Sequence, residues 1–235
     1  MGDSLNCGLS GAGLACVLLF AGCATSHTFK VDAISNPEVE SGDAFHIVTG
    51  NPRVSEEDPQ FQEMAGYVKT ALARRGYHQA AGAEDADIVI EVVYGTNQPQ
   101  IDFKTVSSNA SDVVIDQRTG QVYTGPGAAT RARVLGGGGG PITIDRDDTE
   151  YIPVTTYEKY LKLVAWENRE GVEPEKQTQV WQVTVKTKDD KDDMQRYLPL
   201  LAAASIEFVG EDTENQEKIV LRENDDEVVS VKAGM

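Results

Sequence analysis

The residue types that most often carry catalysis or bind metals are sparse in this chain. It contains three histidines, His27, His46 and His78, and no two of them stand at the spacing with which one helix presents a pair of metal ligands. The Gly-x-Ser-x-Gly and His-Glu-x-x-His patterns of hydrolases and zinc proteases are absent. We therefore expect no catalytic residue, metal or cofactor from local motifs. The alternative is a hydrolase in which His46 or His78 meets a hydroxyl or carboxylate from a distant part of the chain.

Two segments have the composition of ion-binding loops but not their patterns. The acidic run 145–150 lacks the Gly and the distal bidentate Glu of a calcium loop. The glycines 136–140 are not followed by the Lys-Ser or Lys-Thr pair of a phosphate loop, so they predict a flexible linker. The formal net charge of −17 predicts a surface that repels nucleic acid, which we exclude as a partner.

The amino-terminal segment has the pattern of an export signal. Its apolar stretch from Leu9 to Ala21 is shorter than the roughly 20 residues that a membrane-spanning helix needs, but it suits the core of a signal peptide. The stretch closes with Phe20-Ala21-Gly22-Cys23, which resembles a lipobox, the cleavage motif of bacterial lipoproteins. The resemblance implies that residues 1–22 are a signal peptide, that cleavage falls between Gly22 and Cys23, and that the Cys23 thiol carries lipid.

Cysteine usage agrees with lipidation at Cys23. The other two cysteines, Cys7 and Cys16, would leave with the signal peptide, so no disulfide, zinc site or thiol nucleophile would remain. Ala24 stands where an Asp would mark retention at the inner membrane. The resemblance therefore implies a cell-envelope lipoprotein, which in a Gram-negative host would be held on the outer membrane, facing the periplasm, through the lipid on Cys23.

Two amphipathic helices are predicted to position the rest of the chain. Residues 59–75 carry an apolar stripe with helical spacing, and Asp58, Pro59 and Gly76 provide its cap, its first turn and its exit. Residues 190–209 carry a second stripe, which contains a proline that we expect to kink the helix.

The strand patterns are of two kinds. Residues 87–94 form a β-branched run that is apolar on both faces, as is typical of a central strand covered on both sides. The other predicted strands alternate in polarity: 29–33, a long hairpin of 155–167 with 178–187, and a closing hairpin of 218–222 with 228–232.

These elements predict an α+β fold, in which two amphipathic helices pack on a mainly antiparallel sheet. Residues 23–235 have an ordinary length for a single domain. Within them, residues 95–148 lose hydrophobic periodicity and are predicted to form a long loop insertion, with a small hairpin that pairs 113–115 with 121–123.

A second resemblance rests on short patches of the chain. Besides the lipobox, these are Arg75-Gly76-Tyr77 at the end of the first helix, Ala86-Asp87 before the apolar strand, and Val180-Trp181 in a later strand. Together they are similar to the small bacterial lipoproteins of domain-of-unknown-function family forty-one thirty-six. This resemblance implies no reaction and no catalytic residue.

The expected function is that of a membrane-anchored binding or scaffold module without catalysis. Its partner would be an envelope protein or glycan, bound by a sheet face, a strand edge or the insertion. Tyr157, Tyr160, Trp166 and Trp181 are the candidate residues for a binding surface, although aromatic side chains at alternating strand positions more often belong to a core or to cross-strand pairs. The alternative is an envelope hydrolase whose active site follows no known motif.

Overall fold

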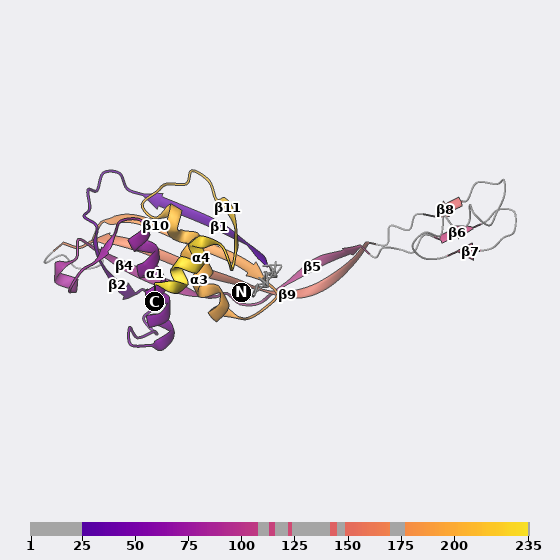
Figure 1. The fold of residues 1–235 in the computed structure, drawn as a ribbon, viewed down its shortest axis with the longest axis horizontal. Helices are drawn as coiled ribbons and strands as arrows, with labels where there is room; N and C mark the ends of the chain where they lie inside the picture. Colours follow the sequence, from indigo (N-terminus) through magenta and orange to yellow (C-terminus); the bar gives the residue numbers. More distant parts are fainter. Residues whose placement is uncertain are drawn as a thin grey trace, which may run out of the picture.

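The computed structural model describes residues 25–107, 113–115, 122–123, 142–144, 149–169 and 177–234 of the 235-residue chain. The predicted signal peptide 1–22, with Gly22 at its cleavage site, and the predicted lipidation residue Cys23 lie outside these ranges. The described part has an α+β fold, in which a mainly antiparallel sheet carries helices on one face (Figure 1). The predicted fold class is confirmed at this level.

Eight strands form the main sheet, in the order β11-β1-β10-β9-β4-β2-β3, with β5 paired to the first half of β9. β2 runs parallel to β3 and β4, and the other pairings in this sheet are antiparallel. The strands span β1 Ser26–Ser35, β2 Ala44–Thr49, β3 His78–Gln79, β4 Ile88–Thr96, β5 Gln100–Ser107, β9 Thr149–Glu167, β10 Gln179–Asp189 and β11 Glu217–Arg222.

A second, three-stranded sheet lies within the predicted insertion. Its order is β7-β6-β8, formed by β6 Val113–Ile115, β7 Val122–Tyr123 and β8 Ile142–Ile144. The predicted hairpin is confirmed in its pairing, because Val114 lies opposite Tyr123 in an antiparallel register. The glycine run 136–140 and the acidic segment 145–148 lie outside the described residues.

Three α-helices, one more than predicted, occur in the described ranges. They are α1 Pro59–Arg74, α3 Met194–Ser205 and α4 Asp226–Ala233, and two short 3-10 turns are η1 Ala83–Asp85 and η3 Ile206–Phe208. The three helices contact one another, and α3 packs on β1, β9 and β10, so they cover one face of the sheet (Figure 1). Across those ranges no helix is long and apolar enough to span a bilayer.

Helix α1 forms where the sequence predicts it, because its end signals are local. Asp58 Oδ1 accepts hydrogen bonds from the backbone amides of Gln60 and Phe61, at 2.9 and 3.3 Å, and Pro59 occupies the first turn. Gly76 follows the helix with a φ of +90°, a left-handed conformation that favours glycine.

The predicted closing hairpin is wrong. Residues 217–222 form a strand, but it pairs with β1, while residues 226–233 form helix α4. Val228 and Val231 are three residues apart and fully buried, whereas Val229 between them is 49% exposed, which is helical spacing. Asp226 and Glu227 stand in the first turn of α4, where carboxylates oppose the helix dipole.

The two faces of the main sheet differ. On β1, for example, Phe29, Val31 and Ala33 are buried beneath the helices, while the residues between them point the other way. β4 lies between β9 and β2, as predicted for a central strand, but the helices cover only one of its faces. The surface opposite α1, α3 and α4 is called the open face below.

Candidate functional site

Three lysines stand in one row across the open face. Lys30 of β1 lies directly opposite Lys186 of β10 on one side and directly opposite Lys218 of β11 on the other. Neighbouring strands lie about 4.8 Å apart, so the three side chains start within about 10 Å of one another. We call Lys218, Lys30 and Lys186 the lysine row.

The lysine row is unfavourable for the stability of the sheet. Like charges placed directly opposite one another on neighbouring strands destabilise the pairing. The ion pairs found among the described residues involve other cations, so none of them neutralises this row. An arrangement that opposes folding and leaves positive charge uncompensated is typical of a site that binds an anion.

A hollow of about 280 Å³ lies beside the lysine row, and all three of its lysines line it. Two further charged residues line the same hollow, and both have partners. Lys188 Nζ lies 2.6 Å from the Asp102 carboxylate, and Glu158 accepts a hydrogen bond of 2.7 Å from Asn97 Nδ2. The Asn97 amide is neutral, so Glu158 keeps its negative charge, and the three cations of the lysine row outweigh this one carboxylate and leave the hollow positive.

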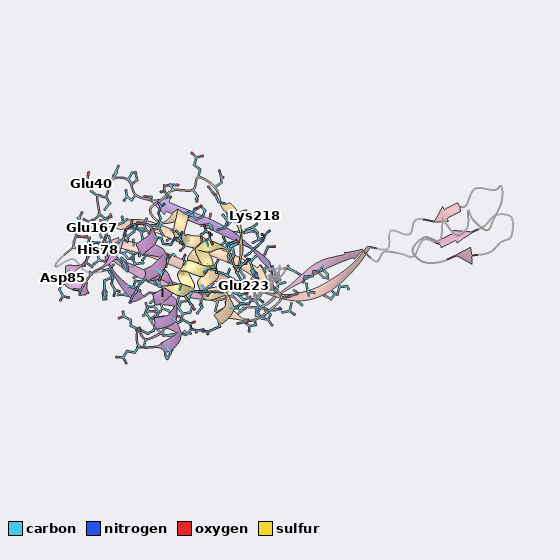
Figure 2. All side chains as sticks on the ribbon, in the orientation of Figure 1. Glu40, His78, Asp85, Glu167, Lys218 and Glu223 are labelled. Carbon is cyan, nitrogen blue, oxygen red and sulfur yellow. The ribbon has the colours of Figure 1, made fainter. Side chains whose placement is uncertain are left out.

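This positive charge contrasts with the chain as a whole, whose formal net charge is −17. Figure 2 shows Lys218 on edge strand β11, while Glu40, Asp85 and Glu167 gather at the end of the sheet furthest from β5. A net charge computed from the sequence does not reveal a local site of the opposite sign.

The four aromatic residues predicted as a binding surface fall on opposite faces of the sheet. Trp181 is buried in the core, 1% exposed, with its ring 6.2 Å from that of Tyr77, and Tyr157 also lies on the helix side. Tyr160 and Trp166 lie on the open face and are partly exposed. Only these two of the predicted four therefore share a face with the lysine row.

Tyr160 extends the lysine row by one strand. It lies directly opposite Lys186 on one side and Gly95 of β4 on the other. A Cβ atom at Gly95 would stand 3.2 Å from the Tyr160 hydroxyl, so the absence of a side chain at Gly95 leaves room for the phenol ring. The Tyr160 hydroxyl therefore lies toward β4, away from Lys186, and Tyr160 is not among the residues that line the hollow.

The histidines do not form a shared site. His46 lies on β2 opposite Val89. His78 Nδ1 lies 3.4 Å from the Asp43 carboxylate, and the side chains of His78 and Asp43 are both largely exposed. Within the described ranges no group of three or more His, Cys, Asp or Glu side chains is arranged to hold a metal ion. His27 is the one of the three that is buried.

His27 belongs to a polar network behind the sheet, which the sequence analysis did not identify. Its Nδ1 atom lies 3.1 Å from the Tyr197 hydroxyl, which donates a hydrogen bond to the Asp189 carboxylate. Lys159, with no exposed surface, lies beside them and donates to the backbone carbonyl of Lys191. The alternating pattern of β9 could have predicted the burial of Lys159, because Lys159 lies two residues before Leu161 and shares the helix side with it.

Burial shifts the ionisation of this network. It lowers the pKa of Lys159, and it raises the pKa of Tyr197 with the help of the bond to Asp189. Burial alone would raise the pKa of Asp189, but hydrogen bonds from Tyr197 and the Asp190 amide outweigh it, and the pKa lies below its ordinary value. Because Lys159 and Tyr197 are inaccessible to solvent, the network has a structural role and offers no place for a substrate.

Comparison with known proteins adds little to this geometry. No family model matches the chain, and no curated protein matches it. Among solved structures, a PDZ domain protein from Parabacteroides distasonis aligns with a TM-score of 0.40 and 9% sequence identity. The alignment covers 84% of this chain and 39% of that protein, so the chain spans well under half of its length.

Proposed function

We propose that this chain is a lipid-anchored protein of the cell envelope that binds an anionic ligand through the lysine row on its open face. The observation that carries the proposal is the direct register of Lys218, Lys30 and Lys186, since three opposed cations are unfavourable until an anion neutralises them. The ligand would bring phosphate or carboxylate groups, on an envelope glycan or protein. The protein would act by binding, without catalysis.

The anchor rests on Ala21-Gly22-Cys23, and the fold is compatible with it. Strand β1 begins at Ser26, three residues after Cys23, so a chain cleaved before Cys23 would keep the whole main sheet. In a Gram-negative host the protein would be held on the outer membrane and face the periplasm. The test is the intact mass of the protein purified from its native membrane. A chain that begins at Cys23 and carries acyl mass supports the anchor, and an uncleaved or unacylated chain contradicts it.

Cys23→Ala provides the matched control for the anchor. We expect this variant to lose labelling by radioactive fatty acid and to accumulate as uncut precursor. If it still fractionates with membranes as completely as the wild type and is cut at the same place, lipid on Cys23 is not what holds the protein.

Ligand binding is testable with inorganic tripolyphosphate as the probe, by titration calorimetry at low and at physiological salt. Lys30→Gln should weaken binding by about tenfold, because it removes the central cation of the row and a charge-assisted hydrogen bond. Binding should also weaken as salt rises, since the contact is electrostatic. Lys232→Gln removes the same charge from the exposed surface of α4 and should leave the affinity within about twofold.

A stability measurement distinguishes a binding site from a structural cluster. Lys30→Gln relieves repulsion with both of its neighbours, so it should raise the free energy of unfolding by about 0.5 kcal/mol while it weakens binding. Equal loss of affinity in Lys30→Gln and Lys232→Gln would contradict the proposal, as would a wild type that does not bind the probe at low salt.

A further inference from the structure

Strand β5 and residues 149–156 of β9 form a two-stranded arm that extends from the main sheet (Figure 1). On one side of this arm, Ile101 lies opposite Thr155 and Phe103 lies opposite Pro153. Ile101 is 71% exposed and Phe103 is 67% exposed, the two most exposed large hydrophobic side chains of the described residues. We call these four residues the apolar side of the arm, and none of them carries a charge.

The other side of the arm is fastened to the body of the protein. Lys104 Nζ lies 2.7 Å from the Asp190 carboxylate, and Lys188 Nζ lies 2.6 Å from the Asp102 carboxylate. Asp102 also accepts a hydrogen bond of 2.9 Å from the Thr156 hydroxyl. These contacts fix which side of the arm points away from the body, and it is the apolar side.

The arm leaves the main sheet at the end where β1 begins. Phe29 lies opposite Thr187, which lies opposite Lys159, so the start of β1 at Ser26 is level with the point where β9 continues into the arm at Thr156. Figure 1 shows the start of β1 and the base of the arm at the same end of the sheet. The three residues from Cys23 to Ser26 reach at most about 10 Å.

From this juxtaposition we propose that the apolar side of the arm lies in the interfacial layer of the bilayer that holds the lipid on Cys23. The inference rests on the anchor of the proposed function. A tether this short keeps the base of the arm at the membrane surface, where removal of Ile101 and Phe103 from water is favourable. The arm lies on the membrane and does not span it.

The test uses residues 23–235 with the Cys23 thiol coupled to a maleimide phospholipid in phosphatidylcholine vesicles. Chemical coupling makes the result independent of lipidation in the cell. Zwitterionic lipid is chosen because the exposed carboxylates of Asp190, Asp192 and Asp193 beside the arm would be repelled by an anionic surface. The reporter is Phe103→Trp in a Trp166→Phe background, in which buried Trp181 gives a constant signal.

Phospholipids brominated on their acyl chains should quench the indole at position 103 about twofold and shift its emission to the blue, because interfacial side chains reach the boundary of the acyl layer. Ile34→Trp in the same background is the matched control. Ile34 is also apolar and exposed, at 54%, but it lies at the opposite end of β1 and should show no quenching.

Two results would overturn the proposal. One is water-like emission at position 103 with no quenching by brominated lipid. The other is a blue shift without lipid quenching that grows with the density of protein on the vesicle, since this would place the arm against a second copy of the chain. The intact mass of the native protein tests the anchor separately, so a failed anchor and an arm that does not touch lipid give different results.

Discussion

The Nζ atom of Lys159 lies 4.5 Å from the centroid of the Tyr197 ring, in a place that has no access to solvent. A buried ammonium group is expensive unless other groups replace its water. Here the ring face and the backbone carbonyl of Lys191 do so, and Asp189 adds a favourable charge. Lys159 thereby links β9 to the loop before α3, which holds the arm through Asp190.

The first prediction concerns the contribution of Lys159 to stability. Lys159→Ala should lower the free energy of unfolding by about 3 kcal/mol, because it leaves a cavity and removes the donor to the Lys191 carbonyl. Lys159→Met fills the same space without a charge that must be buried, so it should cost less than about 1 kcal/mol. Urea unfolding followed by circular dichroism measures both. Equal losses would mean that the charge, rather than the packing of the side chain, is what stabilises the protein here.

The second prediction concerns pH. Burial, followed by the nearby Arg196 guanidinium, holds the pKa of His27 below its ordinary value of 6.5, and the neighbouring Glu223 and Asp189 carboxylates only partly oppose this. Below about pH 6.5 the unfolded chain therefore binds more protons at this residue than the folded chain, so stability falls as pH falls. The free energy of unfolding should decrease between pH 7 and pH 5 in the wild type.

His27→Gln is the matched variant for the pH experiment, since it keeps a polar side chain beside Tyr197 without titrating in this range. Its free energy of unfolding should change less between pH 7 and pH 5 than that of the wild type. The interval stops at pH 5 because protonation of the Glu223 and Asp189 carboxylates, whose pKa values are lowered, removes stability at lower pH in both proteins. Parallel pH profiles would exclude His27 as the source.

The third prediction concerns the end of helix α1. Gly76 has a φ of +90°, and an added Cβ atom would meet nothing within 4 Å, so any loss on substitution comes from the backbone alone. Gly76→Ala should lower the free energy of unfolding by about 1 kcal/mol, and Gly76→Asn by less, because asparagine tolerates the left-handed region better. In thermal unfolding, the wild type should have the highest midpoint temperature, followed by Gly76→Asn and then Gly76→Ala. If alanine is tolerated as well as glycine, the turn does not need its left-handed conformation.

The sequence predicts elements with local signals well. Helix α1 has its cap, stripe and exit within about twenty residues, and the long β9–β10 hairpin alternates along both strands. The lysine row depends instead on register between distant strands. Lys30 and Lys218 become neighbours only when β11 pairs with β1, and no local pattern determines that pairing.

The prediction of a strand in the carboxyl-terminal segment failed for a different reason. The three valines 228, 229 and 231 fit a short strand or one face of a helix equally well, because short apolar runs do not separate a period of 2 from a period of 3.6. Packing against α1 and α3 determines the outcome in the structure. Tertiary contacts of this kind override weak local preference.

The fourth prediction distinguishes a strand from a helix in the carboxyl-terminal segment. In a strand, Val229 and Val231 would share one face, so truncation of either would have a similar effect. In helix α4, Val231 is fully buried and Val229 is 49% exposed. Val231→Ala should therefore lower the free energy of unfolding by about 2 kcal/mol, and Val229→Ala by less than about 0.5 kcal/mol. Urea unfolding of this pair distinguishes the structures, because comparable losses at the two positions would favour the strand and a large difference requires the helix.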